Sequence, residues 1–90
     1  IAESYSLSQN YPNPFNPSTN INFTIPSSQN VNLKVYDILG NEVAGLLNNQ
    51  RLSPGQYKID FNASELTSGI YYYTLSTSDF VNTRKMLLLK

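Results

Sequence analysis

The chain has 90 residues with six Lys and Arg, six Asp and Glu, no His and no Cys, so its formal net charge is zero. This length fits one domain, and the lack of cysteine excludes a disulfide framework or a thiolate zinc site. Apart from the adjacent Arg84 and Lys85 the charges occur singly, and no apolar run approaches the roughly 20 residues of a membrane-spanning helix, so we expect neither a nucleic-acid partner nor membrane insertion.

The first ten residues have an irregular pattern. The chain begins Ile1-Ala2-Glu3, with neither an initiator Met nor a signal-peptide pattern, so we expect a module of a larger precursor. A short edge strand fits residues 5–7. We interpret residues 1–10 as a linker or edge segment and residues 11–90 as the folded domain.

Residues 11–19 read YPNPFNPST, with three prolines among six consecutive residues. Each proline fixes φ and removes a backbone donor, and the residue before it is pushed to extended angles. We therefore expect a stiff extended piece anchored by Tyr11 and Phe15. Because buried aromatic side chains usually serve packing, we expect this piece to cap one end of the core. A proline-rich ligand for another domain is the alternative.

Two strands, each with one buried face, follow this segment. In residues 19–25 apolar side chains alternate with Asn and Thr, which predicts a strand with Ile21, Phe23 and Ile25 facing inward. A turn cluster of Pro, Ser, Gln and Asn separates it from residues 31–38, where the same alternation predicts the next strand.

A hairpin is expected after the second of these strands. Gly40-Asn41 fits a two-residue loop that needs positive φ, followed by a returning strand over residues 42–47. A helix over residues 42–49 is the competing interpretation, which Gly45 disfavours by ~1 kcal/mol relative to Ala.

A further turn and strand are expected in the second half of the chain. Residues 53–56 read SPGQ and fit a type II turn with Gly55 at its third position. Residues 56–61 alternate as a strand with Tyr, Ile and Phe inward. Residues 62–68 form a loop with room for one helical turn, and we expect Leu66 to reach the core.

The densest run of β-branched and aromatic residues is residues 70–77, and such side chains fit a pleated, packed surface. Tyr71 and Tyr73 point to one face, whereas Ile70 and Tyr72 point to the other. Because both faces carry large apolar area, we expect a central strand packed on both sides.

Residues 80–90 form the last expected strand. Its apolar residues 86–89 stand in a row and require cover on both faces, and the flanking Arg84, Lys85 and Lys90 act against aggregation. Short strands with Gly, Pro and Asn turns and no long crossover helix indicate antiparallel sheets. The fold class predicted is an all-β, immunoglobulin-like antiparallel β-sandwich of about seven strands without a disulfide, which we expect to be a monomer.

Side chains for catalysis or metal binding are sparse. Histidine and cysteine, the commonest general base and thiol nucleophile, are missing, so we expect no enzyme and no cofactor. Asp37, Asn41 and Glu42 offer oxygen ligands for Ca²⁺, although Asp in such a position ordinarily serves the turn. Tyr72 offers a single aromatic platform for a sugar, whereas a tyrosine there ordinarily belongs to the core and its rim.

Four motifs carry a family resemblance. They are residues 11–19 (YPNPFNPST), 33–43 (LKVYDILGNEV), 66–73 (LTSGIYYY) and 85–90 (KMLLLK). In this order and spacing they closely resemble the C-terminal sorting domain of type IX secretion cargo (type A), over a region from about Leu7 to the end. The VYDxxG and SGxY portions are also similar to the immunoglobulin-like domain of flagellar hook-capping proteins, but the YPNPFNPST opening and the Lys-terminated tail favour the sorting domain.

The resemblance implies an immunoglobulin-like sandwich at the C-terminus of a cargo protein in Gram-negative Bacteroidetes and their relatives. Such a domain directs its cargo from the periplasm through the outer membrane, to the medium or the cell surface. Its implied partners are the type IX translocon, the outer-membrane shuttle and the sortase, which commonly removes the domain, near or before residues 1–8 here, and joins the cargo to a surface glycolipid. The family's signal elements map onto Pro12, Pro14, Gly55, Gly69, Tyr71, Arg84, Lys85 and Lys90.

Two hypotheses concern the last strand. It is the recognised surface if a receptor adds a strand to its edge and holds Lys90 with acidic groups. It is an internal core strand if residues 86–89 only pack between solubilising flanks. A carbohydrate-binding or adhesive sandwich, and a passive structural domain of the hook-cap type, are the other functional hypotheses.

Overall fold

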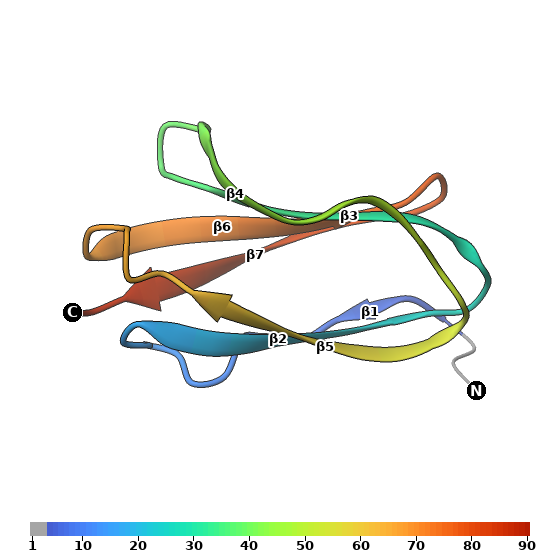
Figure 1. Cartoon of the computed structure of the whole chain (residues 1–90), viewed down its shortest axis with the longest axis horizontal. Helices are drawn as coiled ribbons and strands as arrows, with labels where there is room; N and C mark the ends of the chain where they lie inside the picture. The colour runs from blue at the N-terminus through green and yellow to red at the C-terminus, as the bar shows by residue number, and fades with distance from the viewer. Residues whose placement is uncertain (1–3) are drawn as a thin grey trace.

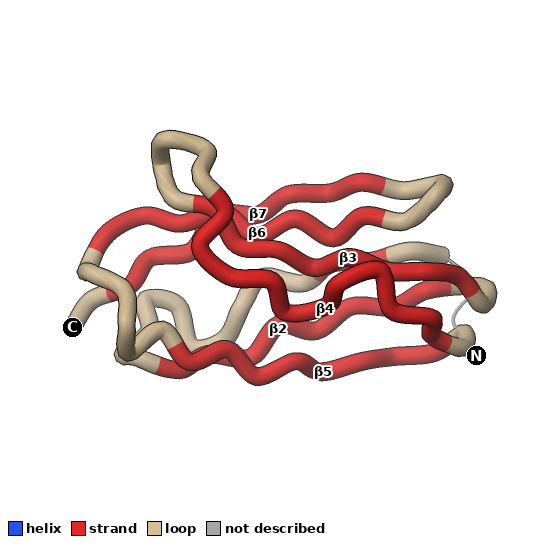
Figure 2. The backbone as a smooth tube through the Cα atoms, turned by 45° about the horizontal axis from the view of Figure 1, so that its top comes forward, coloured by secondary structure: helices blue, strands red, loops and turns tan. Residues whose placement is uncertain are grey.

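The structure, a computed structural model, describes residues 4–90. In that part of the chain all regular structure is β-strand (Figure 2). The strands in chain order are β1 (Ser6–Leu7), β2 (Ser18–Ile25), β3 (Gln29–Tyr36), β4 (Glu42–Leu52), β5 (Gly55–Asn62), β6 (Gly69–Ser76) and β7 (Val81–Leu88).

Two antiparallel sheets form two layers (Figure 1). One has the strand order β1-β2-β5 and the other β4-β3-β6-β7. The chain changes sheet after β2, β4 and β5, which in immunoglobulin lettering gives A-B-E facing C′-C-F-G. The predicted all-β, immunoglobulin-like sandwich of seven strands is confirmed.

The core lies between the layers because each strand turns every second side chain inward. On β2 these side chains are Ile21, Phe23 and Ile25, as the alternation predicts. The buried hydrophobic side chains are Leu7, Phe15, Ile21, Phe23, Ile25, Val31, Leu33, Val35, Leu47, Phe61, Ala63, Tyr71, Tyr73, Leu75, Met86 and Leu88.

The outer face of β6 is open to solvent, so the expectation that both faces are packed is wrong. Tyr71 and Tyr73 are buried, but Ile70 and Tyr72 on the other face are 40% and 37% exposed. A two-layer sandwich covers only the inner face of each sheet. The same applies to the apolar run of β7, after which Leu89 lies half exposed.

The connection from β3 to β4 is a five-residue loop, residues 37–41, and the predicted two-residue loop is wrong. The carboxylate of Asp37 organises it by accepting hydrogen bonds from the N–H groups of Leu39 (2.9 Å) and Asn41 (3.0 Å). Such Asp-centred turns compete well with tight hairpins. Gly40 supplies the positive φ of +87° that the loop needs.

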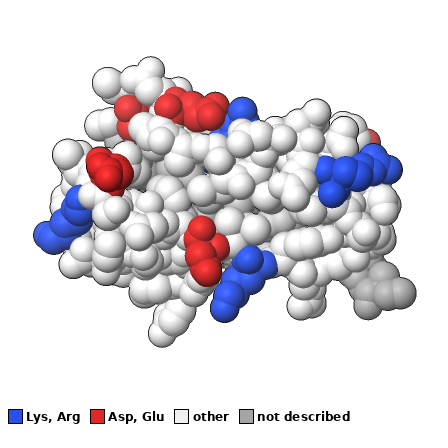
Figure 3. Space-filling view, in the orientation of Figure 1, with Lys and Arg blue, Asp and Glu red and all other residues white. Residues whose placement is uncertain are grey.

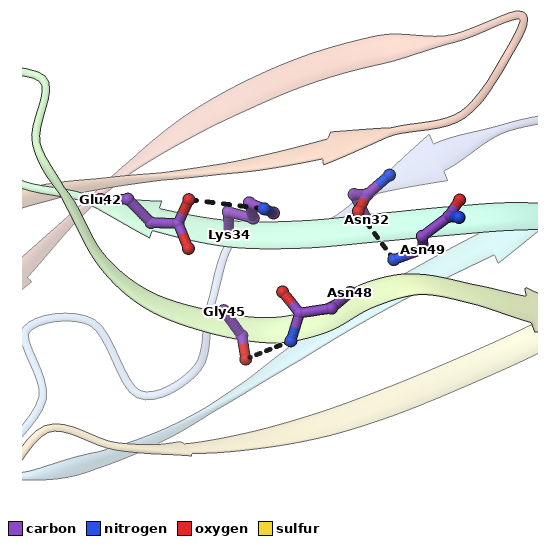
Figure 4. Close-up of polar contacts among 6 residues, drawn as sticks. All are labelled: Asn32, Lys34, Glu42, Gly45, Asn48 and Asn49. Atoms are coloured by element: carbon purple, nitrogen blue, oxygen red, sulfur yellow. Dashed lines mark hydrogen bonds and ion pairs between the residues drawn. The ribbon is translucent and has the colours of Figure 1, made fainter.

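Strand β4 continues five residues beyond the predicted end at residue 47, and it is not helical. Its register to β3 shifts at three places, and Asn49 takes a φ of +52°. The N–H of Asn49 donates to Asn32 Oδ1 at 2.8 Å, so a side chain replaces a ladder bond at the irregularity (Figure 4). Bulges of this kind bend a strand without ending it.

Two further connections, from β4 to β5 and from β5 to β6, lie near predicted turns. Gly55 follows Pro54 with a φ of +151° and starts β5. The loop between β5 and β6 contains one turn, in which Leu66 N–H donates to Ala63 O at 3.0 Å. Leu66 packs partly buried against the core, as expected.

Candidate functional site

Strand β7 lies at one edge of the four-stranded sheet, with β6 as its neighbour. Met86 and Leu88 are fully buried between the sheets. The core packing that one hypothesis gave to the last strand is confirmed for Met86 and Leu88, but the strand lies at an edge of its sheet and is not internal. Recognition of this edge by a receptor stays a prediction. Unpaired backbone groups at such an edge are a template for an added strand.

Residues 9–15, called the covering segment below, occupy the outer edge of β7. The N–H of Phe15 donates to Leu87 O, and Phe15 O accepts from Leu89 N–H, each at 3.0 Å. The Phe15 ring is 2% exposed and lies against Phe61 with ring centroids 6.3 Å apart. This segment thus caps the core, as predicted, and also fills part of a sheet edge.

Two side-chain amides extend this contact toward the middle of β7. Asn13 Oδ1 accepts a hydrogen bond from Leu87 N–H at 3.0 Å. Gln9 Nε2 donates to Lys85 O at 2.7 Å. The prolines on either side of Asn13 have no N–H, so side chains supply groups that a regular strand would supply from its backbone.

The beginning of the covering segment is tied to β2 and to itself. Asn10 is buried, and its side-chain nitrogen donates to Thr19 Oγ1 (3.0 Å) and Pro12 O (3.1 Å). Tyr11 forms a backbone pair with Asn20, with both hydrogen bonds at 3.0 Å. Its side chain is 76% exposed, so the expectation that Tyr11 anchors the segment is wrong. Polar backbone and amide groups, rather than a second ring, hold this part.

The hydroxyl of Tyr73 joins β6 to the start of the covering segment. It donates to Ser8 O at 2.6 Å and accepts from Asn10 N–H at 2.8 Å. Burial raises the pKa of Tyr73 above its ordinary value, and the Asn10 hydrogen bond and the charge of Arg84 offset only part of that rise. The neutral phenol is therefore the form that the fold stabilises.

The tail after β7 is held by the loop between β5 and β6. Lys90 Nζ donates to Ser64 O and to Leu66 O, each at 2.7 Å. The Lys90 N–H donates to Ser68 Oγ at 2.9 Å. The ammonium group thus supplies hydrogen-bond donors to two carbonyl groups of an irregular loop, while the side chain stays exposed.

Gly69 and Tyr71 stand at the start of β6, beside the end of β7. Gly69 pairs with Leu88 and has a φ of +152°, a conformation that side chains with a Cβ rarely adopt. The Tyr71 hydroxyl donates to Thr67 O, four residues upstream, at 2.7 Å. This is the geometry of the tyrosine corner of immunoglobulin-like sandwiches, so the SGxY motif fixes how the chain enters β6.

Arg84 and Lys85 point to opposite faces of β7. Arg84 Nε donates to Leu7 O at the end of β1. Lys85 pairs with Tyr72 on the outer face, where both are exposed. They do not form one basic cluster with Lys90, and Figure 3 shows basic and acidic side chains dispersed over the face in view.

The structure brings together most of the residues that the family resemblance implies. They lie near the C-terminal end of β7. These are Pro14 on the covering segment, between Asn13 and Phe15, Gly69 and Tyr71 on β6, Lys85 on β7 and Lys90 in the tail. The Pro12 carbonyl instead accepts hydrogen bonds from Asn10 and from Thr19 of β2. Gly55 lies elsewhere: it pairs with Ile25, at the end of the β2–β5 ladder opposite Ser18 and Asn62. Gly55 acts in the β4–β5 turn, remote from the rest.

The calcium hypothesis finds no support in the arrangement of its residues. The Asp37 carboxylate is engaged by loop N–H groups, and Glu42 Oε1 lies 3.4 Å from Lys34 Nζ (Figure 4). Within residues 4–90 no three side chains of His, Cys, Asp or Glu gather in a metal-binding group. These carboxylates stabilise the β3–β4 connection.

Sequence reasoning missed four residues that build the site. They are Gln9 and Asn13, which bond to β7, Ser68, which accepts from the tail, and Tyr73, which holds the covering segment. An Asn between two prolines was the available signal, because its backbone has few ways to pair and its amide is free to substitute. Gln9 and Ser68 carry no comparable signal.

Comparison with protein families identifies the family of the chain. The family model for the secretion system C-terminal sorting domain matches residues 9–89. The chain belongs to this family. It is a sorting domain for type IX secretion, and the family implies a cargo upstream of the domain and export of that cargo. No curated protein matches the chain. Residues 4–90 of the sorting domain include no helix able to cross a membrane.

Proposed function

We propose that outer-membrane components of the type IX system recognise the folded sorting domain at the end of β7 and its tail. The observation that supports this is the convergence of separate signal elements at that place. Gly69 faces Leu88 in the ladder, Lys90 bonds to Ser68, and Asn13 bonds to Leu87. Motifs that lie 22 to 74 residues apart in sequence, such as those joined by the Lys90–Ser68 and Asn13–Leu87 bonds, meet only in the folded domain.

The proposed recognition reads a folded surface rather than a flexible tail. Lys90 is exposed but held by two carbonyl groups, so its position is fixed before a receptor arrives. Pre-ordering lowers the entropic cost of association. Acidic groups of a receptor gain a charge-assisted hydrogen bond to this ammonium, which affects specificity and the association rate more than affinity.

The domain passes through the periplasm attached to its cargo, then reaches the cell surface or the medium. In this proposal the sortase cleaves upstream of the sandwich and joins the cargo to a surface glycolipid. The domain itself performs no catalysis and binds no cofactor. It contributes a recognition surface that exists only while the sandwich is folded.

Substitution of Lys90 tests this recognition. Deleting residues 85–90 would remove Met86 and Leu88 from the core, so Lys90→Ala separates recognition from folding better than truncation. The matched control is Lys58→Ala, which removes an exposed Lys from β5 in the other sheet. Both variants are attached to a fluorescent cargo with a signal peptide and expressed in a host with an intact type IX system.

We expect Lys90→Ala to lose most surface and medium fluorescence and Lys58→Ala to keep it. Removing two exposed hydrogen bonds costs only about 1 kcal/mol of stability, so both domains remain folded, which circular dichroism of the purified variants checks. Equal export of the two variants contradicts recognition through Lys90.

Sugar binding remains a second candidate because Tyr36 and Tyr72 are directly opposite each other on the outer face of the four-stranded sheet. Tyr36 is half-buried and Tyr72 is 37% exposed, and a partly exposed aromatic pair offers a platform for a sugar ring. A glycan panel tests this: saturable binding that Tyr72→Ala abolishes supports it, and absence of binding by the parent domain rejects it.

A further inference from the structure

The sheet edges of this domain are protected in different ways. β1 has only two residues, β4 is interrupted by register shifts, and β5 carries the exposed charges Lys58 and Asp60. Short length, bulges and charge are all known devices against strand addition. β7 also carries exposed charges, Arg84 and Lys85, but it pairs with β6 in an unbroken register over eight residues, and the part of the strand after Lys85 is an apolar run without charge.

The covering segment protects β7 by imitating a parallel strand. In a parallel ladder, a residue donates to one partner residue and accepts from the residue two positions further along. Phe15 does this with Leu87 and Leu89, and its bridge to Leu88 is parallel.

Two positions earlier, the imitation continues with side chains. The bonds that a parallel strand would make next are an acceptor for Leu87 N–H and a donor for Lys85 O. Asn13 Oδ1 and Gln9 Nε2 supply them. Four consecutive outward groups of β7, from Lys85 O to Leu89 N–H, are therefore satisfied as an added strand would satisfy them.

The apolar part of the contact also has the form of a binding site. Phe15 inserts its ring beside Phe61 and is almost fully buried, whereas Asn13 and the prolines around it stay exposed. Strand-addition sites work in this way: backbone bonds give affinity and a pocket for one side chain gives specificity.

We propose that the outer edge of β7 is a strand-addition site that the chain fills with residues 9–15, and that an extended receptor strand takes their place. This rests on the proposed recognition at β7. The bound segment defines the ligand: it runs parallel to β7 and carries an aromatic or large aliphatic residue at the position of Phe15. The covering segment also lies on the path toward the cargo, so access to the site depends on the chain upstream of residue 9.

Amide hydrogen exchange tests whether the covering segment opens. The variant combines Asn13→Ala, which removes the acceptor for Leu87 N–H, with Tyr73→Phe, which releases Ser8 and Asn10. Asn16→Ala is the control, since Asn16 is exposed and its side chain makes no hydrogen bond within residues 4–90.

We expect the amides of Leu87 and Leu89 to exchange about tenfold faster or more in the double variant, since each lost hydrogen bond shifts opening by nearly that factor. The amides of the β3–β6 ladder exchange through global unfolding, so in the parent and in the variant they should stay more protected than Leu87 and Leu89 and should respond more steeply to urea. Unchanged protection at Leu87 and Leu89 in the double variant, or a urea dependence of their exchange equal to that of the ladder amides, overturns the proposal.

A labelled peptide of residues 9–17 is the probe for the vacated site. An occupied site weakens apparent affinity by the fraction of open molecules, so the double variant should bind the peptide about tenfold more tightly than the parent domain. A peptide with Phe15→Ala should not bind. Absence of binding to a variant with exposed Leu87 and Leu89 amides overturns the strand-addition site.

Light scattering of the same double variant shows whether the outer edge of β7 binds a second copy of this chain or is left open for a receptor strand. A dimer that the peptide dissociates assigns the site to a second copy of this chain and overturns the receptor strand as occupant. A monomer that binds the peptide supports it. These experiments use the purified domain, whereas the Lys90→Ala assay measures export from cells. A negative binding result therefore overturns the strand-addition site without affecting recognition through Lys90, and normal export of Lys90→Ala overturns that recognition without affecting the binding results.

Discussion

Replacing Tyr73 with Phe isolates the hydroxyl that holds the covering segment on the sandwich. The ring stays in place, so the fully buried core position opens no cavity. What is lost is the hydrogen bond donated to Ser8 O at 2.6 Å and the one accepted from Asn10 N–H at 2.8 Å. The Asn10 N–H then lies in the protein without its acceptor.

The magnitude follows from these two bonds. A neutral hydrogen bond contributes about 0.5–1.5 kcal/mol net, and a buried donor left without a partner costs about 1–3 kcal/mol. We expect a loss of about 2–3 kcal/mol, against the roughly 5–13 kcal/mol typical of a domain with this number of residues. With an m-value of about 1–1.5 kcal/mol/M, the urea midpoint falls by about 2 M.

Equilibrium urea unfolding of Tyr73→Phe measures this effect, and Tyr72→Phe is the matched control. The Tyr72 hydroxyl has no hydrogen-bond partner within residues 4–90 and its ring is partly exposed, so its removal should change stability by less than about 0.5 kcal/mol. If the two variants unfold at the same urea concentration, the Tyr73 hydroxyl does not hold the segment as described.

Two further predictions concern pH and Gly69. The fold raises the pKa of Tyr73, so the stability linked to its neutral form is complete below the unfolded value of about 10 and is lost as pH rises through the folded value. The stability difference between the parent and Tyr73→Phe should therefore shrink above pH 10, and a constant difference up to pH 11 argues against the shift. Gly69→Ala should lower the free energy of unfolding by about 1–2 kcal/mol, because alanine is strained at the Gly69 φ of +152°. An added Cβ meets no atom within 4 Å, so steric overlap adds nothing to this loss. A urea midpoint within error of the parent refutes backbone strain at this position.

Side-chain periodicity predicted the layers of this fold well, because burial on one face of a strand leaves a direct trace in sequence. The alternation of Ile21, Phe23 and Ile25 is an example. It failed at residues 70–77, since a run that is apolar on both faces does not reveal whether a third layer exists to cover Ile70 and Tyr72. It also failed to predict the length of β4. The strand continues past an irregularity at which the Asn49 N–H donates to the side-chain oxygen of Asn32.

The candidate site was predictable only in part. The family motifs named Gly69, Tyr71 and Lys90, and proline chemistry predicted a stiff segment that caps the core. Residues 9–15 reach the edge of β7 through contacts that span up to 76 residues in sequence. Nothing local in Gln9 encodes a bond to Lys85 O, so such contacts emerge only from the packed sandwich.

The most direct test of the central claim is export of a fusion protein. Residues 1–90 are attached to the C-terminus of a fluorescent protein with a signal peptide, and this fusion is expressed in a host with an intact type IX system and in a strain lacking it. Fluorescence at the surface or in the medium only in the intact host is the result that sorting by this domain predicts. Fluorescence held in the periplasm of both strains, with the domain shown to be folded, would contradict it.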